Sequence, residues 1–344
     1  MDWSTERILV TIYDVANKAG VGMKTVSRVL NDEAHVRPAM RARVLQAIEE
    51  LGYRPNLAAR QLAANRSFLI SFIMNDVTSS YQTSMLVAAS AECRRRNYHL
   101  VVEIMEPDES ATGLVERVMA NLRPDGIMLV PPLSNDADLI QAIANRGTKL
   151  VRVAATLQGY GHVVPVRDTE VSQKLVAHLL ASGKKRIALI APPYAKAAAH
   201  ERVTGYKLAL AAAELPLESD YIVQGDFTFA SGKSATERLL GLPQPPDAIF
   251  AANDAMALGA MAVLQQRGIG IPEDMAVAGF DDSPGSRTVY PPLTTVRQPI
   301  SGMARDAIAK LLGGPVDQEP LVPELIIRGS TQVGFVETVI AQDK

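Results

Sequence analysis

Short apolar runs, separated by helix-length segments, dominate the chain between residues 68 and 279. The eight runs lie at residues 68–73, 100–104, 126–130, 150–154, 186–190, 221–224, 248–251 and 275–279. This alternation predicts right-handed strand-helix-strand units, because parallel strands need a crossover that usually contains a helix. Two sets of four runs therefore predict an α/β body of two similar lobes with parallel sheets.

Length and composition narrow the class of protein. A chain of 344 residues exceeds one ordinary domain and predicts two or three. The single cysteine, Cys93, excludes an intramolecular disulfide and favours a reducing compartment. Residues 1–10 do not resemble a secretory signal, and no stretch approaches the ~20 apolar residues of a membrane span. We therefore expect a cytoplasmic protein with no membrane partner.

Motifs for metal binding and catalysis are missing from the sequence. The five histidines show no metal-binding spacing, and one cysteine offers no second thiolate. No G-x-S-x-G motif marks a nucleophile, although a dispersed Ser-His-Asp triad is not excluded. We expect no metal, no cofactor and no enzymatic activity.

Residues 11–31 have the pattern of two short helices joined by a tight turn. Thr11 followed by Asp14 is typical of a capping box, and Gly20 can end the first helix in a left-handed conformation. On the second helix Met23, Lys24, Ser27 and Arg28 fall on one outward stripe. A helix-turn-helix presents such a stripe to base edges in the major groove. The alternative is a helical hairpin with an ordinary solvated face.

A third helix is predicted over residues 38–51, where Met40, Val44, Leu45, Ile48 and Leu51 recur at helical spacing and should close a small core. An extended connector and the short apolar run 57–63 follow. That run is too short to form a stable helix alone in water, so we expect it to order only against a partner. The alternative is a plain linker. Lys and Arg exceed Asp and Glu in residues 11–66, whereas the remainder is mildly acidic, which suits phosphate contact through the N-terminal part.

The run TIYDVANKAGVGMKTVSRVLN at residues 11–31, with YRPN at 53–56, resembles the headpiece of the lactose-repressor (LacI/GalR) family of bacterial transcriptional regulators. The resemblance implies a hinge helix whose leucine, Leu62, enters the minor groove of an operator. It implies these DNA-binding residues: Thr11, Met23, Lys24, Thr25, Ser27, Arg28, Asn31, Tyr53, Asn56, Ala59 and Leu62. Gly22 and Arg37 depart from the serines usual at two helix starts and should weaken capping slightly.

Polar residues follow several of the predicted strands. Asn75, Asp76, Asn253, Asp281 and Asp282 all stand directly after apolar runs. Ligands of open parallel sheets bind beyond the carboxyl ends of the strands, so these residues are candidates for contact with a polyhydroxylated ligand. The alternative is that they are helix caps and loop residues, which Asp and Asn also favour.

The resemblance extends over the whole chain and sharpens the candidate site. Motifs similar to the family's stand at residues 201–205 (ERVTG), 252–259 (ANDAMALG), 279–282 (GFDD) and 291–299 (PPLTTVRQP). They imply these effector-binding residues: Asp76, Tyr81, Asp168, Arg202, Phe227, Asn253, Asp281 and Gln298. The expected effector is a mono- or oligosaccharide, with a purine as the alternative. The segment DVTSSYQ at 76–82 and the absence of a glycine near Val171 depart from the family pattern.

These features predict an all-α helix-turn-helix headpiece and a two-lobed body like the periplasmic binding proteins. The expected divisions are a tail (1–10), a headpiece (11–55), a hinge (56–66) and a body (67–344), with a first lobe at 67–182 and 297–325 and a second at 183–296 and 326–344. The expected function is a sequence-specific DNA-binding regulator, most simply a repressor, associated with the nucleoid. The resemblance implies a homodimer on a near-palindromic operator. The rivals are a periplasmic transport protein and an enzyme with an appended DNA-binding domain.

Overall fold

The computed structural model describes residues 10–30, 35–53, 61, 66–192, 197–316 and 321–332, without the side chains of residues 197–200. The chain divides into two compact units, Met1–Ser67 and Phe68–Lys344. Within the described ranges, no helix has the length and apolar character needed to cross a bilayer.

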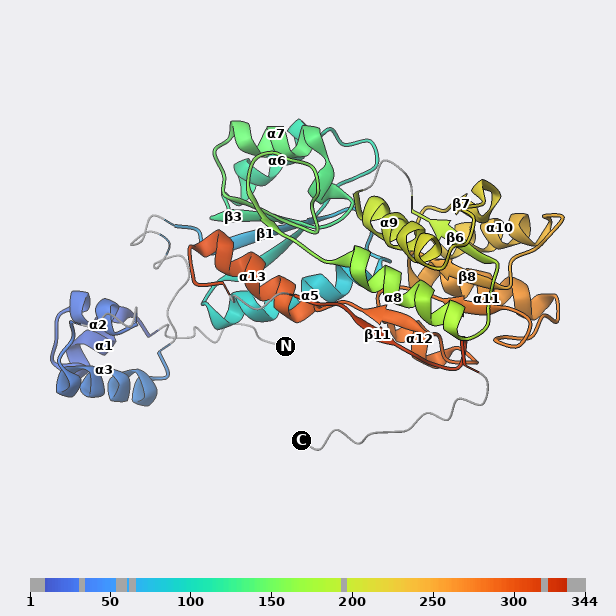
Figure 1. Cartoon of the computed structure of the whole chain (residues 1–344). Coiled ribbons are helices and arrows are strands. Elements are labelled where there is room, and N and C mark those ends of the chain that lie inside the picture. The colour runs from blue at the N-terminus through green and yellow to red at the C-terminus, as the bar shows by residue number, and fades with distance from the viewer. Residues whose placement is uncertain are drawn as a thin grey trace, which may run out of the picture. The chain divides into compact units, whose positions relative to one another are not determined.

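The described part of the first unit includes the helices α1 (Ile12–Ala19), α2 (Met23–Leu30) and α3 (Pro38–Leu51) (Figure 1). The predicted capping box is present, because Thr11 Oγ1 accepts from Asp14 N while Thr11 N donates to the Asp14 carboxylate over 2.8 Å. Gly20 ends α1 with φ 63° and donates its N–H to carbonyls of the last turn. Its positive φ explains why glycine stands there. The helix-turn-helix geometry is confirmed.

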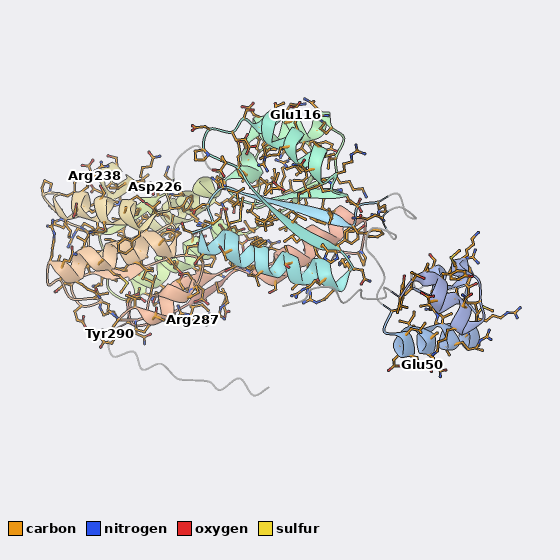
Figure 2. All side chains as sticks on the ribbon, turned by 180° about the vertical axis from the view of Figure 1, so that it is seen from behind. Glu50, Glu116, Asp226, Arg238, Arg287 and Tyr290 are labelled. Atoms are coloured by element: carbon orange, nitrogen blue, oxygen red, sulfur yellow. The ribbon has the colours of Figure 1, made fainter. Side chains whose placement is uncertain are left out.

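The core of this unit is built from small apolar side chains, with Val15, Val26 and Val44 fully buried. Leu45 was predicted to belong to this core, but 51% of it is exposed. Ala47 is buried instead. The prediction from helical spacing was therefore wrong for Leu45, because it assigned the larger apolar residue to the core. Across the outer faces Lys18 pairs with Glu50 at 2.7 Å, and Glu50 projects from α3 in Figure 2.

The first lobe of the second unit contains a five-stranded parallel sheet with strand order β2-β1-β3-β4-β5. Its strands are β1 (Leu69–Met74), β2 (His99–Ile104), β3 (Gly126–Leu129), β4 (Leu150–Val153) and β5 (His162–Val164). Two helices cover each face (Figure 1): α6 (Ala111–Asn121) and α7 (Ala137–Asn145) on one, α5 (Ser80–Arg95) and α13 (Ile300–Leu312) on the other. A short 3-10 helix, η1 (Leu133–Asn135), precedes α7.

The second lobe repeats this plan with a four-stranded parallel sheet in the order β7-β6-β8-β9. Its strands are β6 (Ile187–Ala191), β7 (Ile222–Gln224), β8 (Ala248–Ala251) and β9 (Ala276–Ala278), with a 3-10 helix, η2 (Ser219–Tyr221), before β7. The helices α8 (Asp168–Ala181) and α9 (Ala197–Ala212) cover one face, and α10 (Phe229–Leu240) and α11 (Asp254–Gln266) cover the other. All eight predicted strands are present, and both main sheets are parallel as predicted.

The lobes are joined by segments far apart in the sequence. Helix α8 packs with the second sheet, so the chain leaves the first lobe before Asp168, earlier than the predicted boundary at residue 182. Strand β10 (Thr295–Arg297) then leads into α13 on the first lobe, and β11 (Glu324–Ile326) returns to pair with β10 in an antiparallel ribbon. A short helix, α12 (Pro284–Thr288), lies against α11. This arrangement places the carboxyl ends of both parallel sheets around one cavity.

Candidate functional site

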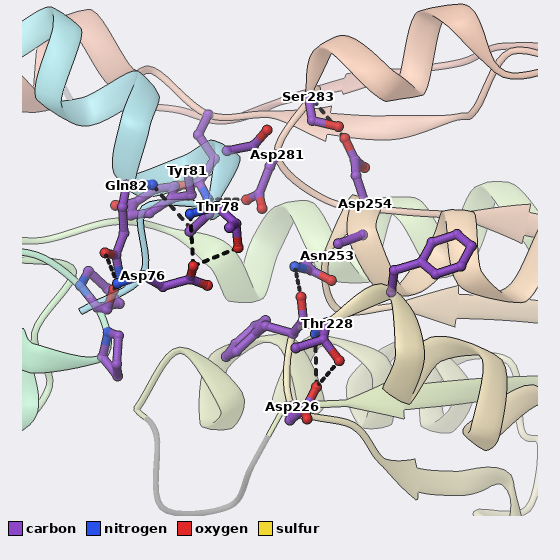
Figure 3. A pocket seen from close by; sticks show the side chains of 18 of the residues that line it. Asp76, Thr78, Tyr81, Gln82, Asp226, Thr228, Asn253, Asp254, Asp281 and Ser283 are labelled. Carbon is purple, nitrogen blue, oxygen red and sulfur yellow. Dashed lines mark hydrogen bonds between the residues drawn. The ribbon is translucent and has the colours of Figure 1, made fainter. Parts of the chain in front are cut away.

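One cavity of about 440 Å³ is lined by residues that follow strands of both lobes. All eight residues assigned to the effector site from the sequence contribute to its wall: Asp76, Tyr81, Asp168, Arg202, Phe227, Asn253, Asp281 and Gln298. Figure 3 shows labelled side chains from the segments after β1, β7, β8 and β9 turned toward the same space. The residues that follow strand ends therefore converge on one cavity, where the rule for parallel sheets places ligand sites.

A buried ion pair forms one wall of the cavity. Arg202 on α9 contacts Oδ2 of Asp168 through Nε at 3.0 Å and Nη2 at 2.9 Å, and both side chains are almost fully buried. Arg202 also donates to the carbonyl of Ala252, and its guanidinium carbon lies 3.7 Å from the ring centroid of Phe280. Three groups, the Asp168 carboxylate, the Ala252 carbonyl and the Phe280 ring, thus fix the guanidinium plane, which leaves it oriented and only partly free to donate to a ligand.

Asp281 and Asp282 are adjacent carboxylates in opposite environments. Burial raises the pKa of Asp281 to about 7, opposed by Arg202 and reinforced by Asp254, while Gln298 Nε2 donates to its Oδ1 at 2.8 Å. Burial also disfavours ionisation of Asp282, yet hydrogen bonds from Arg287, Arg328 and Arg297 outweigh it and lower the pKa to about 2. Of the two, Asp281 lines the cavity.

Asp282 has a structural role that the sequence did not separate from that of its neighbour. Its carboxylate ties α12 to the β10-β11 ribbon, because Arg287 belongs to α12 and Arg297 to β10. Arg328 is buried beside it and reaches Oδ1 at 2.6 Å. Figure 2 shows Arg287 at the surface of the second lobe, so one end of this network lies at the outer face.

Two of the side chains expected to contact a ligand already have hydrogen-bond partners within the protein. Asn253 caps α11 by accepting from Met256 N at 2.9 Å, and its Nδ2 donates to the Phe227 carbonyl at 2.9 Å. Asp76 accepts from the N–H and the hydroxyl of Thr78 at 2.8 and 2.6 Å. The capping and turn roles left open as the alternative are therefore present, and each side chain keeps only part of its hydrogen-bonding capacity for a ligand.

Aromatic side chains supply the apolar part of the wall. Phe227 has φ 74°, and the hydrogen bond from Asn253 to its carbonyl holds this uncommon backbone conformation. Tyr81 lies on α5 in the first lobe, and Phe229 begins α10 in the second. The cavity therefore combines flat rings with carboxylates.

Several lining residues were not singled out from the sequence. Asp226 follows β7 and accepts from the N–H and hydroxyl of Thr228, and both residues line the cavity. Gln82 is buried and holds the segment after β1 by donating to Asn75 and to the Pro131 carbonyl. Asp226 could have been found, because it obeys the same strand-end rule that selected Asp76 and Asp281. Gln82 lies in the first turn of α5, where no local signal marks it.

The candidate DNA-binding face lies on the first unit. On α2, Met23 is 52% exposed, and Lys24 and Arg28 are exposed beside it, whereas Thr25 and Ser27 are partly buried. Thr11 is exposed at the start of α1, and Tyr53 is packed into the small core. Asn31, Asn56, Ala59 and Leu62 lie outside the described residues.

No group of three or more His, Cys, Asp or Glu side chains in the described ranges could hold a metal ion.

An exposed helix-turn-helix stripe, on one chain with a two-lobed body around a polar cavity, defines a DNA-binding regulator that responds to a small ligand.

Comparison with known proteins identifies the family. The description "Bacterial regulatory proteins, lacI family" matches residues 11–56, and "Periplasmic binding protein-like domain" matches residues 176–331. Catabolite control protein A of Priestia megaterium is 33% identical over 294 residues, which cover 85% of this chain and 88% of that protein. The chain belongs to the LacI family of bacterial transcriptional regulators.

Two solved structures resemble the whole chain. A complex of the transcriptional regulator CelR with cellobiose is 31% identical, covers 93% of this chain and 99% of that one, and gives a TM-score of 0.69. The lac repressor dimer bound to operator and the anti-inducer ONPF is 30% identical to this chain and gives a TM-score of 0.74. That alignment covers 94% of this chain and 99% of the lac repressor chain. The predicted fold class and the function as a DNA-binding transcriptional regulator are confirmed.

Proposed function

We propose that this regulator binds a near-palindromic operator as a homodimer and that a neutral sugar or similar polyol in the cavity changes its affinity for DNA. The observation that carries the effector proposal is the composition of the cavity wall. Five carboxylates and one arginine line it among the described residues: Asp76, Asp168, Asp226, Asp254, Asp281 and Arg202. A ligand rich in hydroxyl donors suits such a wall, because each buried oxygen needs a hydrogen-bond partner.

The charge of the wall argues against an anionic ligand. Arg202 is already paired with Asp168, so its positive charge is largely balanced before any ligand arrives. A phosphate or carboxylate entering the cavity would meet Asp281 and Asp226 with no unpaired cation among the described lining residues. The rings of Tyr81 and Phe227 offer flat apolar faces for a sugar ring. The cellobiose complex of CelR supports this class of effector.

For the DNA contact we propose direct readout by α2. Lys24 and Arg28 project from the exposed side of α2, while Val26 and Val29 pack it into the core. Arginine pairs bidentately with guanine, and lysine reaches bases or phosphates. We propose that the hinge residues, including Leu62, contact the minor groove, as the family resemblance implies.

A homodimer is supported by an exposed apolar area on the first lobe. Strand β2 lies at the edge of its sheet, and Val102 and Ile104 on it are 40% and 41% exposed. Val87 on the neighbouring α5 is 64% exposed. An uncovered edge strand with apolar side chains is a liability in a monomer, and a second copy would cover it. The operator-bound lac repressor structure, which is a dimer, agrees with this proposal.

The test combines selection of the operator with measurement of ligand binding. Duplexes selected from random DNA should share a near-palindromic sequence, and Arg28→Ala should relax the preference at one base pair per half-site. Titration with glucose, lactose and cellobiose should reveal a sugar that binds to wild type and is recovered unchanged after incubation. Loss of all sequence preference in wild type would contradict the DNA-binding proposal, and chemical conversion of the sugar would favour an enzyme.

A further inference from the structure

Basic side chains gather at the edge of the first-lobe sheet where its strands begin. Residues 92–99, 123–126 and 146–150, which lead into β2, β3 and β4, contain six Lys or Arg and two Asp or Glu. The loops at the opposite edge, residues 75–79, 105–110, 131–138 and 154–161, contain six Asp or Glu and no Lys or Arg. We call the six bases the basic edge: Arg94, Arg95, Arg96, Arg123, Arg146 and Lys149. All but Arg96 are exposed.

The basic edge lies around the point where the chain enters the body. The backbone carbonyl of Phe68 accepts from His99 N, and that of Leu69 accepts from Asp125 N, both at 2.9 Å. The ring of Phe68 lies 5.5 Å from that of Tyr98. These contacts bring the segments that carry Arg94–Arg96 and Arg123 to both sides of Phe68, and β4 continues the same edge beyond β3.

Structural roles within the lobe account for only part of this charge. The buried Glu92 pairs with Arg95 and Arg96, yet 70% of the Arg95 side chain remains exposed. Arg94 and Arg95 also lie in the last turn of α5, where cations interact favourably with the helix dipole. Arg123 has no such explanation, because its φ of 45° is a conformation that suits glycine better. In a body where Asp and Glu outnumber Lys and Arg, such a cluster indicates an anionic partner.

We propose that the basic edge contacts phosphates of the DNA duplex that the helix-turn-helix binds. Tyr53 belongs to the core of the first unit, and about 15 residues of chain, at most about 50 Å when fully extended, connect it to Phe68. Double-stranded DNA carries one negative charge per about 1.7 Å of its axis, so a bound duplex presents many phosphates within that length. Guanidinium groups match the geometry of phosphate oxygens, and five of the six bases are arginines.

This contact goes beyond the proposed function, which assigns DNA binding to α2 and the hinge. Phosphate contacts add affinity for any sequence and carry no base preference of their own. The basic edge should therefore strengthen binding to operator and to unrelated DNA alike, while α2 sets the difference between them.

The first test compares two double variants that remove the same charge. Arg94→Gln with Arg123→Gln changes the basic edge, and Arg238→Gln with Arg267→Gln changes two exposed arginines of the second lobe, where Figure 2 shows Arg238. Fluorescence anisotropy should follow binding of the full chain to the selected operator duplex and to a random-sequence duplex over a range of salt concentrations.

The slope of log affinity against log salt should fall by about 2 for each bound subunit in the basic-edge variant, on both duplexes. Its preference for operator over random sequence should equal that of wild type. The second-lobe variant should keep the wild-type slope. A wild-type slope in the basic-edge variant, or an equal fall in the second-lobe variant, would overturn the proposal.

The second test locates the contact on the DNA. Ethylation of single phosphates in the selected operator duplex should weaken binding of wild type at a set of positions. At some of these positions ethylation should no longer weaken binding of the Arg94→Gln, Arg123→Gln variant, whereas the second-lobe variant should keep the whole set. An identical set for wild type and the basic-edge variant would overturn the DNA contact and favour an acidic protein as the partner of this edge.

Discussion

Breaking the buried ion pair between Arg202 and Asp168 should strongly destabilise the body, because both side chains are almost fully buried. In Arg202→Met the Asp168 carboxylate, 1% exposed, loses its cation while the Ala252 carbonyl loses a donor. Removing one partner of a buried pair typically costs about 3 to 5 kcal/mol. That is a large share of the roughly 5 to 15 kcal/mol by which a protein is stable, and corresponds to a Tm lower by about 6 to 20 °C for a unit of this size.

A double-mutant cycle tests whether the cost comes from the pair. Arg202→Met, Asp168→Asn and the double variant should be compared by urea unfolding of the ligand-free chain at one concentration, followed by circular dichroism. The double variant should be more stable than the sum of the single effects implies, by about 0.5 to 3 kcal/mol. Additive effects, or a cost below about 1 kcal/mol for Arg202→Met, would refute the view that the pair is a structural element of the cavity wall.

Other consequences follow from single positions. Gly22→Ser should stabilise the first unit by a few tenths of a kcal/mol, because serine is the better cap and a Cβ at Gly22 meets no atom within 4 Å; slower hydrogen exchange in α2 would show it. In the same assay Leu45→Gln should change little, whereas Val44→Ala should cost about 2 kcal/mol. Burial raises the pKa of Asp281 from 3.8 to about 7, so the folded protein keeps a proton that the unfolded chain releases. The contribution of Asp281 to the free energy of unfolding should therefore fall as the pH rises from about 3.8 to about 7. Asp281→Asn should remove this fall. Burial lowers the pKa of His178 below its ordinary value of 6.5. The stability that the neutral His178 contributes is therefore complete above pH 6.5 and is lost as the pH falls below it. In urea unfolding, His178→Gln should lose less stability than wild type when the pH is lowered.

The sequence predicts the main strands because each is an apolar run bounded by turn residues. It does not predict β5 or β11, since three residues starting at the exposed His162, or at Glu324, carry no such run. We also predicted the boundary between the two lobes too late in the chain, after α8 instead of before it. A helix that covers one sheet has the same apolar pattern as a helix that covers the other, so only packing decides which lobe contains α8.

The candidate residues were found by the strand-end rule and the family motifs, but their individual roles depend on contacts that no local pattern encodes. Asp281 and Asp282 are neighbours of the same type, and only the convergence of Arg287, Arg297 and Arg328 from three elements separates them. Asn253 is typical of both a helix cap and a ligand contact, and the structure shows the cap. Leu45 shows the same limit for the first unit, because helical spacing does not reveal that a smaller residue fills the core.

The most direct measurement of the proposed control of DNA binding is operator affinity with and without the sugar that binds most tightly. Fluorescence anisotropy with the selected operator duplex should show the affinity changing about 5- to 150-fold when the cavity is saturated. By linkage, calorimetry should show operator changing the sugar affinity by the same factor. Asp281→Asn should bind operator as wild type does without sugar and should lose most of the response. Identical operator affinity with and without saturating sugar in wild type would contradict the proposal that the cavity controls the headpiece.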